Sequence, residues 1–285
     1  MGMQALNQGI LTLKNPVMWI YPIIAGLFVF AAVMFGLADI TDYFGLKLAI
    51  LFFIFVSPFF IAGTYAAVKS GDFSVNAYLK SAADGYFRVM LPCFVLLFAI
   101  ILLMFIATVP VFFAQSAAGL SVFAYIIGIT LILLTFFFDT AAIFEDKKIF
   151  ESLKRSIELV MAKPLEVIMF YIVAALLVFV LFMLYTMVWS SLLAEEFEPL
   201  LTMSQSELAA FSQDSMNLVN LLGEHGVFVT AVLSGIAVLL FTLLFMPYKA
   251  IFYRDELMVS LISMLGKIPE KSDDGDLSVE DFYKK

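Results

Sequence analysis

Long uncharged apolar runs alternate with short charged segments along this sequence. Five runs contain no Asp, Glu, Lys or Arg: residues 17–38, 48–68, 89–138, 167–194 and 226–248. The third run is too long for one helical crossing of a hydrocarbon core about 30 Å thick, so it must be two spans joined near residues 114–119. The pattern therefore predicts six membrane-spanning helices, at about 17–38, 48–68, 89–113, 120–144, 165–193 and 226–250.

The charged segment after the fourth span has the periodicity of an amphipathic helix. Its apolar face would consist of Ile149, Phe150, Leu153, Ile157, Val160 and Met161. Its polar face would consist of Lys147, Lys148, Glu151, Lys154, Arg155 and Glu158, with Glu151–Arg155 and Lys154–Glu158 at i,i+4 spacing. We expect this helix to lie at the membrane surface or on the neighbouring spans.

Similar apolar stripes occur in three other segments, residues 3–16, 74–92 and 255–269. All four striped segments run into a proline: Pro16, Pro92, Pro164 and Pro269. The sequences at the ends of the spans are also alike. AIFEDKKIFESL at 142–153 and AIFYRDELMVSL at 250–261 share AIF and SL at the same spacing. GTYAAVKSG at 63–71 has a weaker similarity to DTAAIFED.

These likenesses predict three copies of one unit, each an amphipathic helix followed by a span out and a span back, around a pseudo-threefold axis. The alternative is that any multi-span protein with short loops shows striped helices before prolines, and that the short matches arose by chance.

Composition places the chain in the membrane class. With 63% hydrophobic residues, 14% charged residues and a mean hydropathy of +1.04, it lies far from the composition of soluble domains and is expected to be an all-α integral membrane protein. A net charge of −8 argues against a nucleic-acid partner. The sequence has one cysteine, Cys93, and one histidine, His225, which are too few to supply the ligands and nucleophiles of most metal, haem and covalent catalytic sites. We therefore expect no catalytic residues, metal site or cofactor.

The basic residues predict the orientation. When alternate loops are grouped, fifteen Lys and Arg fall on one side and Lys47 alone on the other, which predicts both termini in the cytoplasm, across a prokaryotic plasma membrane.

The outer loop 195–225 has no Lys or Arg, and SQSE at 204–207 predicts a capping box that opens a helix. This loop is expected to be a helical lid or, alternatively, a docking surface. Residues 270–285 are expected to be an acidic cytoplasmic tail.

Two ionisable residues fall within the apolar depth of the spans, Asp139 and Lys249. A buried charge in lipid costs at least about 2.5–3.5 kcal/mol, so the two are candidates for an intramembrane charge pair. Such a pair would be a structural clamp or part of an ion path. Alternatively, Asp139 bonds locally with Thr140 while Lys249 extends to the headgroups.

Two stretches carry a resemblance to a known group of membrane proteins. ESLKRSIELVMAKPLEVIMFYIV, which follows a span that ends in an acidic residue, and NQGILTLKNPVMWIYPIIAGL near the start resemble the membrane domain of some glycerophosphoryl diester phosphodiesterases and of uncharacterised prokaryotic, especially archaeal, multi-span proteins. The resemblance covers about residues 1–30 and 136–180. It implies a helical membrane bundle and supplies no catalytic residues, because the soluble phosphodiesterase barrel with its metal ligands is absent from this sequence.

The expected function is that of a non-enzymatic integral membrane protein, either an accessory or scaffold subunit of a membrane complex or a lipid-associated protein. Its expected partners are membrane lipids and other membrane protein subunits. The alternative is a transporter or channel for a hydrophobic or lipidic substrate. The sequence leaves the oligomeric state open.

Overall fold

The computed structural model describes residues 2–38, 43–113 and 118–258, with the backbone alone at 38, 107–113, 118–124 and 215. Every element in the described part is helical, and six segments are long and apolar enough to cross a membrane. They are Pro16–Leu37, Phe44–Ser70, Val75–Ile106, Tyr125–Phe144, Pro164–Leu192 and Met216–Met258. The predicted all-α, six-span fold is thus confirmed. The turn at 114–117, most of segment 255–269 and the tail 270–285 lie outside the described residues.

The helices follow the order expected for three successive units. The first unit contains α1 (Gly2–Thr12), the short 3-10 helix η1 (Pro16–Trp19), α2 (Ile20–Ala38), α3 (Phe44–Leu51), the π-helical turn η2 (Phe52–Val56) and α4 (Ser57–Ser70). The second contains α5 (Val75–Phe113), α6 (Ala118–Thr135) and α7 (Phe138–Phe144). The third contains α8 (Ile149–Ala162), α9 (Pro164–Leu192), α10 (Ala194–Thr202), α11 (Gln205–Phe211), α12 (Ser215–Phe252) and the π-helical turn η3 (Tyr253–Met258).

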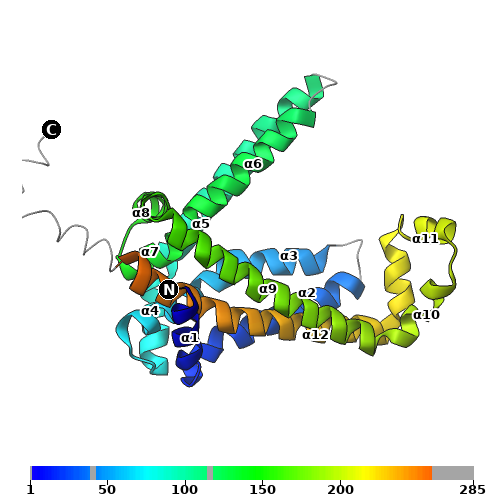
Figure 1. The fold of residues 1–285 in the computed structure, drawn as a ribbon, viewed down its shortest axis with the longest axis horizontal. Helices are drawn as coiled ribbons and strands as arrows, with labels where there is room; N and C mark the ends of the chain where they lie inside the picture. Colours follow the sequence, from blue (N-terminus) through cyan, green and yellow to red (C-terminus); the bar gives the residue numbers. More distant parts are fainter. Residues whose placement is uncertain (1, 39–42, 114–117, 259–285) are drawn as a thin grey trace, which may run out of the picture.

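The three units do not pack against one another to the same extent. Helix α2 packs along α12, and α4 packs along α5, whereas Figure 1 shows α6 leaning away from α9 and α12. Contacts between the second and third units include those of α8 with α5, α6 and α7. In addition, the Tyr171 hydroxyl of α9 donates to the Leu133 carbonyl of α6 at 2.7 Å. The threefold repeat itself stays a prediction.

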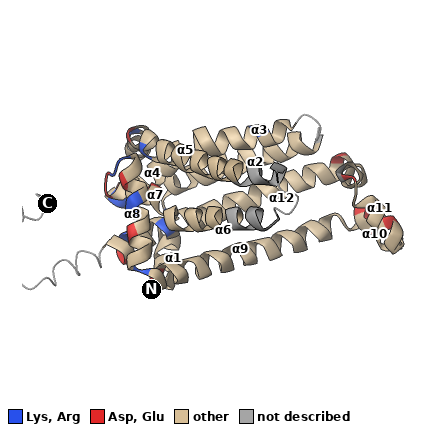
Figure 2. Cartoon of the chain, turned by 90° about the horizontal axis from the view of Figure 1, so that it is seen from above, with Lys and Arg blue, Asp and Glu red and all other residues tan. Residues whose placement is uncertain are grey.

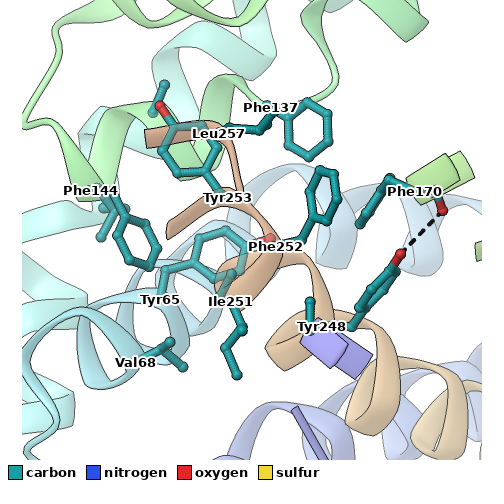
Figure 3. Close-up of a cluster of buried hydrophobic side chains, with 14 of the residues drawn as sticks. Tyr65, Val68, Phe137, Phe144, Phe170, Tyr248, Ile251, Phe252, Tyr253 and Leu257 are labelled. Carbon is teal, nitrogen blue, oxygen red and sulfur yellow. Dashed lines mark hydrogen bonds between the residues drawn. The ribbon is translucent and has the colours of Figure 1, made fainter. Parts of the chain in front are cut away.

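Charged residues gather at one end of the bundle. Figure 2 shows Lys and Arg together with Asp and Glu around α8 and the adjoining ends of α4, α5 and α7, while α10 and α11 at the opposite end carry acidic residues only. Most of the large buried side chains lie at this charged end, where aromatic rings from α4, α7, α9 and α12 pack together (Figure 3). We call it the charged end from here on.

Helix α1 makes its closest approach to α12 through its small residues. Gly2, Ala5 and Gly9 are buried, and a Cβ atom on Gly9 would lie 3.1 Å from the Tyr248 backbone nitrogen. Met3 of the predicted stripe is 69% exposed. The helix therefore approaches its neighbour closely through its small residues, while Leu6 and Leu13 of the stripe are partly buried against the core.

Helix α8 follows the same rule. Ser152, Ser156 and Leu159 face the bundle, while Phe150 of the predicted stripe is 71% exposed. Of the two locations that the pattern left open, the helix rests on neighbouring spans by the face that carries Ser152, Ser156 and Leu159. It turns part of its apolar stripe outward, as a helix in the membrane interface does.

The second striped segment does not end at its proline. Helix α5 continues through Pro92 from Val75 to Phe113, so this amphipathic segment and the following span are one helix. Pro is tolerated inside membrane helices because neighbouring helices and waters satisfy the freed backbone groups.

The outer loop is helical, as expected. It consists of α10, α11 and the part of α12 before Gly223, whose φ of 60° breaks the helix. The predicted capping box at the start of α11 is confirmed, since Ser204 N donates to Glu207 Oε2 at 2.7 Å and Glu207 N donates to Ser204 Oγ at 3.4 Å. Figure 1 shows α10 and α11 beyond the ends of α9 and α12.

A close crossing between spans joins α2 and α12 at two glycines. A Cβ atom on Gly26 would lie 2.8 Å from the Gly235 oxygen, and a Cβ atom on Gly235 would lie 2.8 Å from the Gly26 oxygen. Small residues at such crossings let helix backbones approach, which is a main source of helix association in lipid.

We expect Gly235→Ala to lower the stability of the protein in detergent by about 1–3 kcal/mol, because the added methyl meets a backbone atom that cannot move aside. Thermal unfolding measures the loss. Gly128→Ala is the control, because its Cβ would lie 3.6 Å from the Met104 Cε atom, an ordinary contact. Equal melting temperatures of the Gly235→Ala variant and the parent protein would contradict the close contact between α2 and α12.

Candidate functional site

The structure brings Asp139 and Lys249 together inside the bundle. Lys249 Nζ lies 2.8 Å from both carboxylate oxygens of Asp139, and the two side chains are 6% and 10% exposed, respectively. Asp139 is in the first turn of α7, and Lys249 is near the end of α12. Two residues that are 110 positions apart in the sequence thus form one buried ion pair.

A break in the fourth span precedes Asp139. Helix α6 ends at Thr135 and α7 begins at Phe138, so the backbone at 136–137 leaves the regular hydrogen-bond pattern. Ser156 of α8 repairs the break, because its hydroxyl donates to the Leu134 carbonyl at 2.9 Å and accepts from the Phe137 amide at 3.0 Å. Buried backbone groups need such partners, so α8 is part of the structure that positions α7.

Each charge of the pair has further partners. The Thr140 amide donates to Asp139 Oδ1 at 2.7 Å, and the Tyr65 hydroxyl donates to Asp139 Oδ2 at 3.2 Å. Lys249 Nζ lies 4.1 Å from the centre of the Phe136 ring, within range of a cation–π interaction. The local Thr140 bond therefore coexists with the pair, and Lys249 turns inward instead of extending to the headgroups. We call Tyr65, Asp139 and Lys249 the charge centre.

Tyr65 is the member of the charge centre that the sequence analysis missed. It is fully buried on α4, the return span of the first unit, while Asp139 and Lys249 lie on the return spans of the second and third units. The weak echo between GTYAAVKSG and DTAAIFED was the available signal, because it sets Tyr65 at about the depth of Asp139.

A second ionic contact joins the end of α7 to α8 and η3. Arg155 Nε donates to both oxygens of Glu145, at 2.9 and 2.8 Å, and the Tyr253 hydroxyl donates to Glu145 Oε1 at 2.8 Å. Arg155 binds Glu145 in place of the i,i+4 partner Glu151 that its spacing suggested. The other predicted pair, Lys154–Glu158, is confirmed at 3.7 Å.

A third ionic contact joins the end of α7 to α4 and α5. Asp146 Oδ2 lies 2.9 Å from Lys69 Nζ, and Asp146 Oδ1 lies 2.5 Å from an Arg88 guanidinium nitrogen. The hydrogen bond from Lys69, followed by the contact with Arg88, holds the pKa of Asp146 below its usual value. Two consecutive residues, Glu145 and Asp146, thus connect α7 to four other elements.

The charge centre has the arrangement of a structural ion pair whose charged atoms all have partners. Both carboxylate oxygens and the ammonium group are engaged, which is what makes a charge tolerable in an apolar interior. Across residues 2–38, 43–113 and 118–258 there is no group of three His, Cys, Asp or Glu side chains placed to hold a metal ion.

We expect Lys249→Met to destabilise the protein by about 3–5 kcal/mol, because it leaves Asp139 as a buried charge without its partner. The double variant Asp139→Leu with Lys249→Met should recover much of this loss, since no charge remains to be solvated. Thermal unfolding of the single and double variants gives the coupling. Lys154→Met, at a site whose side chain is 79% exposed, is the control and should melt like the parent. If the stability losses of the two single variants add up to that of the double variant, the stabilising ion pair between Asp139 and Lys249 is contradicted.

Comparison with known proteins places the chain in a family. No curated protein and no solved structure matches it. One family model, described as a domain of unknown function (DUF7847), matches residues 3–256, which include all six spans, the outer loop and the charge centre. The chain therefore belongs to the DUF7847 family.

Proposed function

We propose that this chain is a non-enzymatic integral membrane protein that acts as an accessory or scaffold subunit of a membrane complex, or as a lipid-associated protein. The observation that carries the proposal is the closed charge centre, in which each charged atom already has its partners. Pumps and channels distribute polar groups along their spans. Here the runs at 17–38, 48–68, 89–138, 167–194 and 226–248 contain no Asp, Glu, Lys or Arg.

The outer helices support a role in contacts with other subunits. Neither α10 nor α11 has a buried residue, and Leu201 of α10 is 85% exposed. Helix α10 is nevertheless held in place, because Glu196 lies 2.7 Å from the His225 ring and Phe197 packs on Trp189. A segment that is fixed but covers little of its own protein favours a docking surface over a lid.

The proposed location is a prokaryotic plasma membrane, with both termini in the cytoplasm. The basic residues at the charged end support this orientation, because positively charged loops stay on the cytoplasmic side. The resemblance to the membrane domain of glycerophosphoryl diester phosphodiesterases stays a prediction.

A transporter for a hydrophobic substrate is the second candidate, and one observation favours it. An apolar groove of about 380 Å³ lies between α9 and α12. Its lining includes Val178, Phe182, Tyr185, Ser234, Val238 and Phe241. A groove with this lining would accept an alkyl chain, although a contact with bulk lipid has the same chemistry.

Native purification in polymer nanodiscs with quantitative mass spectrometry tests the scaffold proposal. We expect other membrane subunits to co-purify at a fixed stoichiometry, and Leu201→Ser to reduce their recovery severalfold, because it removes an exposed apolar contact from α10. Leu176→Ser, at an exposed leucine of α9, is the matched control and should leave the recovery unchanged. A lone homo-oligomer that retains lipid would contradict the scaffold and favour the transporter.

Cysteine labelling tests the orientation. In a Cys93→Ser background, Ser204→Cys should react with a membrane-impermeant maleimide in intact cells, because Ser204 is exposed at the start of α11. Lys154→Cys, on the exposed side of α8, should react only after permeabilisation. The reverse pattern would overturn the proposed orientation.

A further inference from the structure

A polar cavity of about 310 Å³ opens at the charged end between α4, α5 and the end of α7. Its polar lining consists of Lys69, Ser70, Ser81, Asp84, Arg88 and Asp146. This cavity lies apart from the charge centre and plays no part in the function proposed above.

We propose that this cavity binds the phosphate of a zwitterionic phospholipid headgroup, with Lys69 and Arg88 as the phosphate ligands and Asp84 as the partner of the headgroup ammonium. The inference does not depend on the scaffold proposal, because it concerns a different surface and a different ligand.

Asp146 holds the two basic groups close together. Its two oxygens lie 2.9 Å from Lys69 Nζ and 2.5 Å from an Arg88 nitrogen, so cations from two different helices point to one place. Their donors are not exhausted. An ammonium has three N–H donors, of which Lys69 uses one on the Ile143 carbonyl and one on Asp146, and a guanidinium has five. The remaining donors match the oxygens of a phosphate, which prefers charge-assisted hydrogen bonds of this kind.

The depth of the cavity favours a lipid as the source of the phosphate. Arg88 comes immediately before the apolar run of the third span, which begins at Val89. Phe87 and Leu91 on the same stretch of α5 are exposed, as side chains that face lipid tails are. The floor of the cavity is closely packed, since a Cβ atom on Gly85 would lie 2.7 Å from Ile143 Cδ1. A headgroup in the cavity would therefore have its acyl chains beside α5.

The charge balance selects the headgroup class. The cavity has two basic residues, Lys69 and Arg88, and two acidic residues, Asp84 and Asp146, so a neutral zwitterion complements it better than a net anion does. Asp84 makes no ion pair with any residue of the described structure, and it lies one helical turn from Arg88, at i,i+4 on α5. An ammonium with N–H donors, as in phosphatidylethanolamine, would pair with Asp84, whereas the quaternary group of phosphatidylcholine has no N–H to donate.

Lipid titration of the full-length protein in detergent, followed by thermal unfolding and native mass spectrometry, tests the site. Short-chain phosphatidylethanolamine should raise the melting temperature and stay bound, more than phosphatidylglycerol or phosphatidylcholine of the same chain length. Arg88→Gln should weaken its apparent affinity about tenfold, because a charge-assisted contact to phosphate is lost. Lys80→Gln is the matched control, since it removes an exposed basic residue of α5 that does not line the cavity.

A second variant separates binding from folding. Asp84→Asn breaks no ion pair, so it should leave the lipid-free melting temperature unchanged and reduce the preference for phosphatidylethanolamine over phosphatidylcholine. Soluble phosphoethanolamine distinguishes the source of the phosphate, and stabilisation equal to that by the lipid would overturn the assignment to a membrane lipid. Equal responses to all three lipids, or equal affinities of Arg88→Gln and the parent, would overturn the site.

Discussion

The buried contact between Asp139 and Lys249 is the interaction on which the rest of the bundle depends. Lipid tails are as apolar as leucine, so spans in a membrane associate through close packing and polar contacts rather than through the hydrophobic effect. The charge centre provides those contacts where α4, α7 and α12 meet, and its Tyr65 belongs to the aromatic cluster shown in Figure 3. Because the surrounding medium cannot solvate a single ion, the pair holds the three return spans in one arrangement.

The other ionic contacts extend this constraint over the charged end. Glu145 reaches α8 and η3, and Asp146 reaches α4 and α5, so two neighbouring residues after α7 fix elements on opposite sides. At the other end α6 leans away from α9, and the helices expose apolar side chains. The bundle is thus fixed at its charged end and exposes apolar side chains toward the opposite end.

Much of this architecture could be predicted from the sequence, because a membrane imposes span length and charge-free runs on any chain that crosses it. Asp139 and Lys249 were recognisable as a candidate pair for the same reason, since an ionisable residue at that depth needs a partner. Tyr65 was harder to recognise, because a tyrosine in an apolar run has many packing roles and only the weak likeness of GTYAAVKSG to DTAAIFED indicated its depth. The break at residues 136–137 also left no signal, since its repair depends on Ser156, a residue of another helix whose position only the tertiary structure defines.

The amphipathic helices show that a rule from soluble proteins holds only in part here. In water, the apolar stripe of a helix faces the protein core, because burial removes large apolar side chains from solvent. Beside a bilayer those side chains lose nothing by facing lipid, so the contact with the protein goes to whichever face permits the closest approach. In α1 that face is Gly2, Ala5 and Gly9, and in α8 it includes Ser152 and Ser156. The small residues between the members of the stripe therefore indicate the side that binds the bundle. The stripe itself is divided, since Leu6 and Val160 pack against the core while Met3 and Phe150 are exposed.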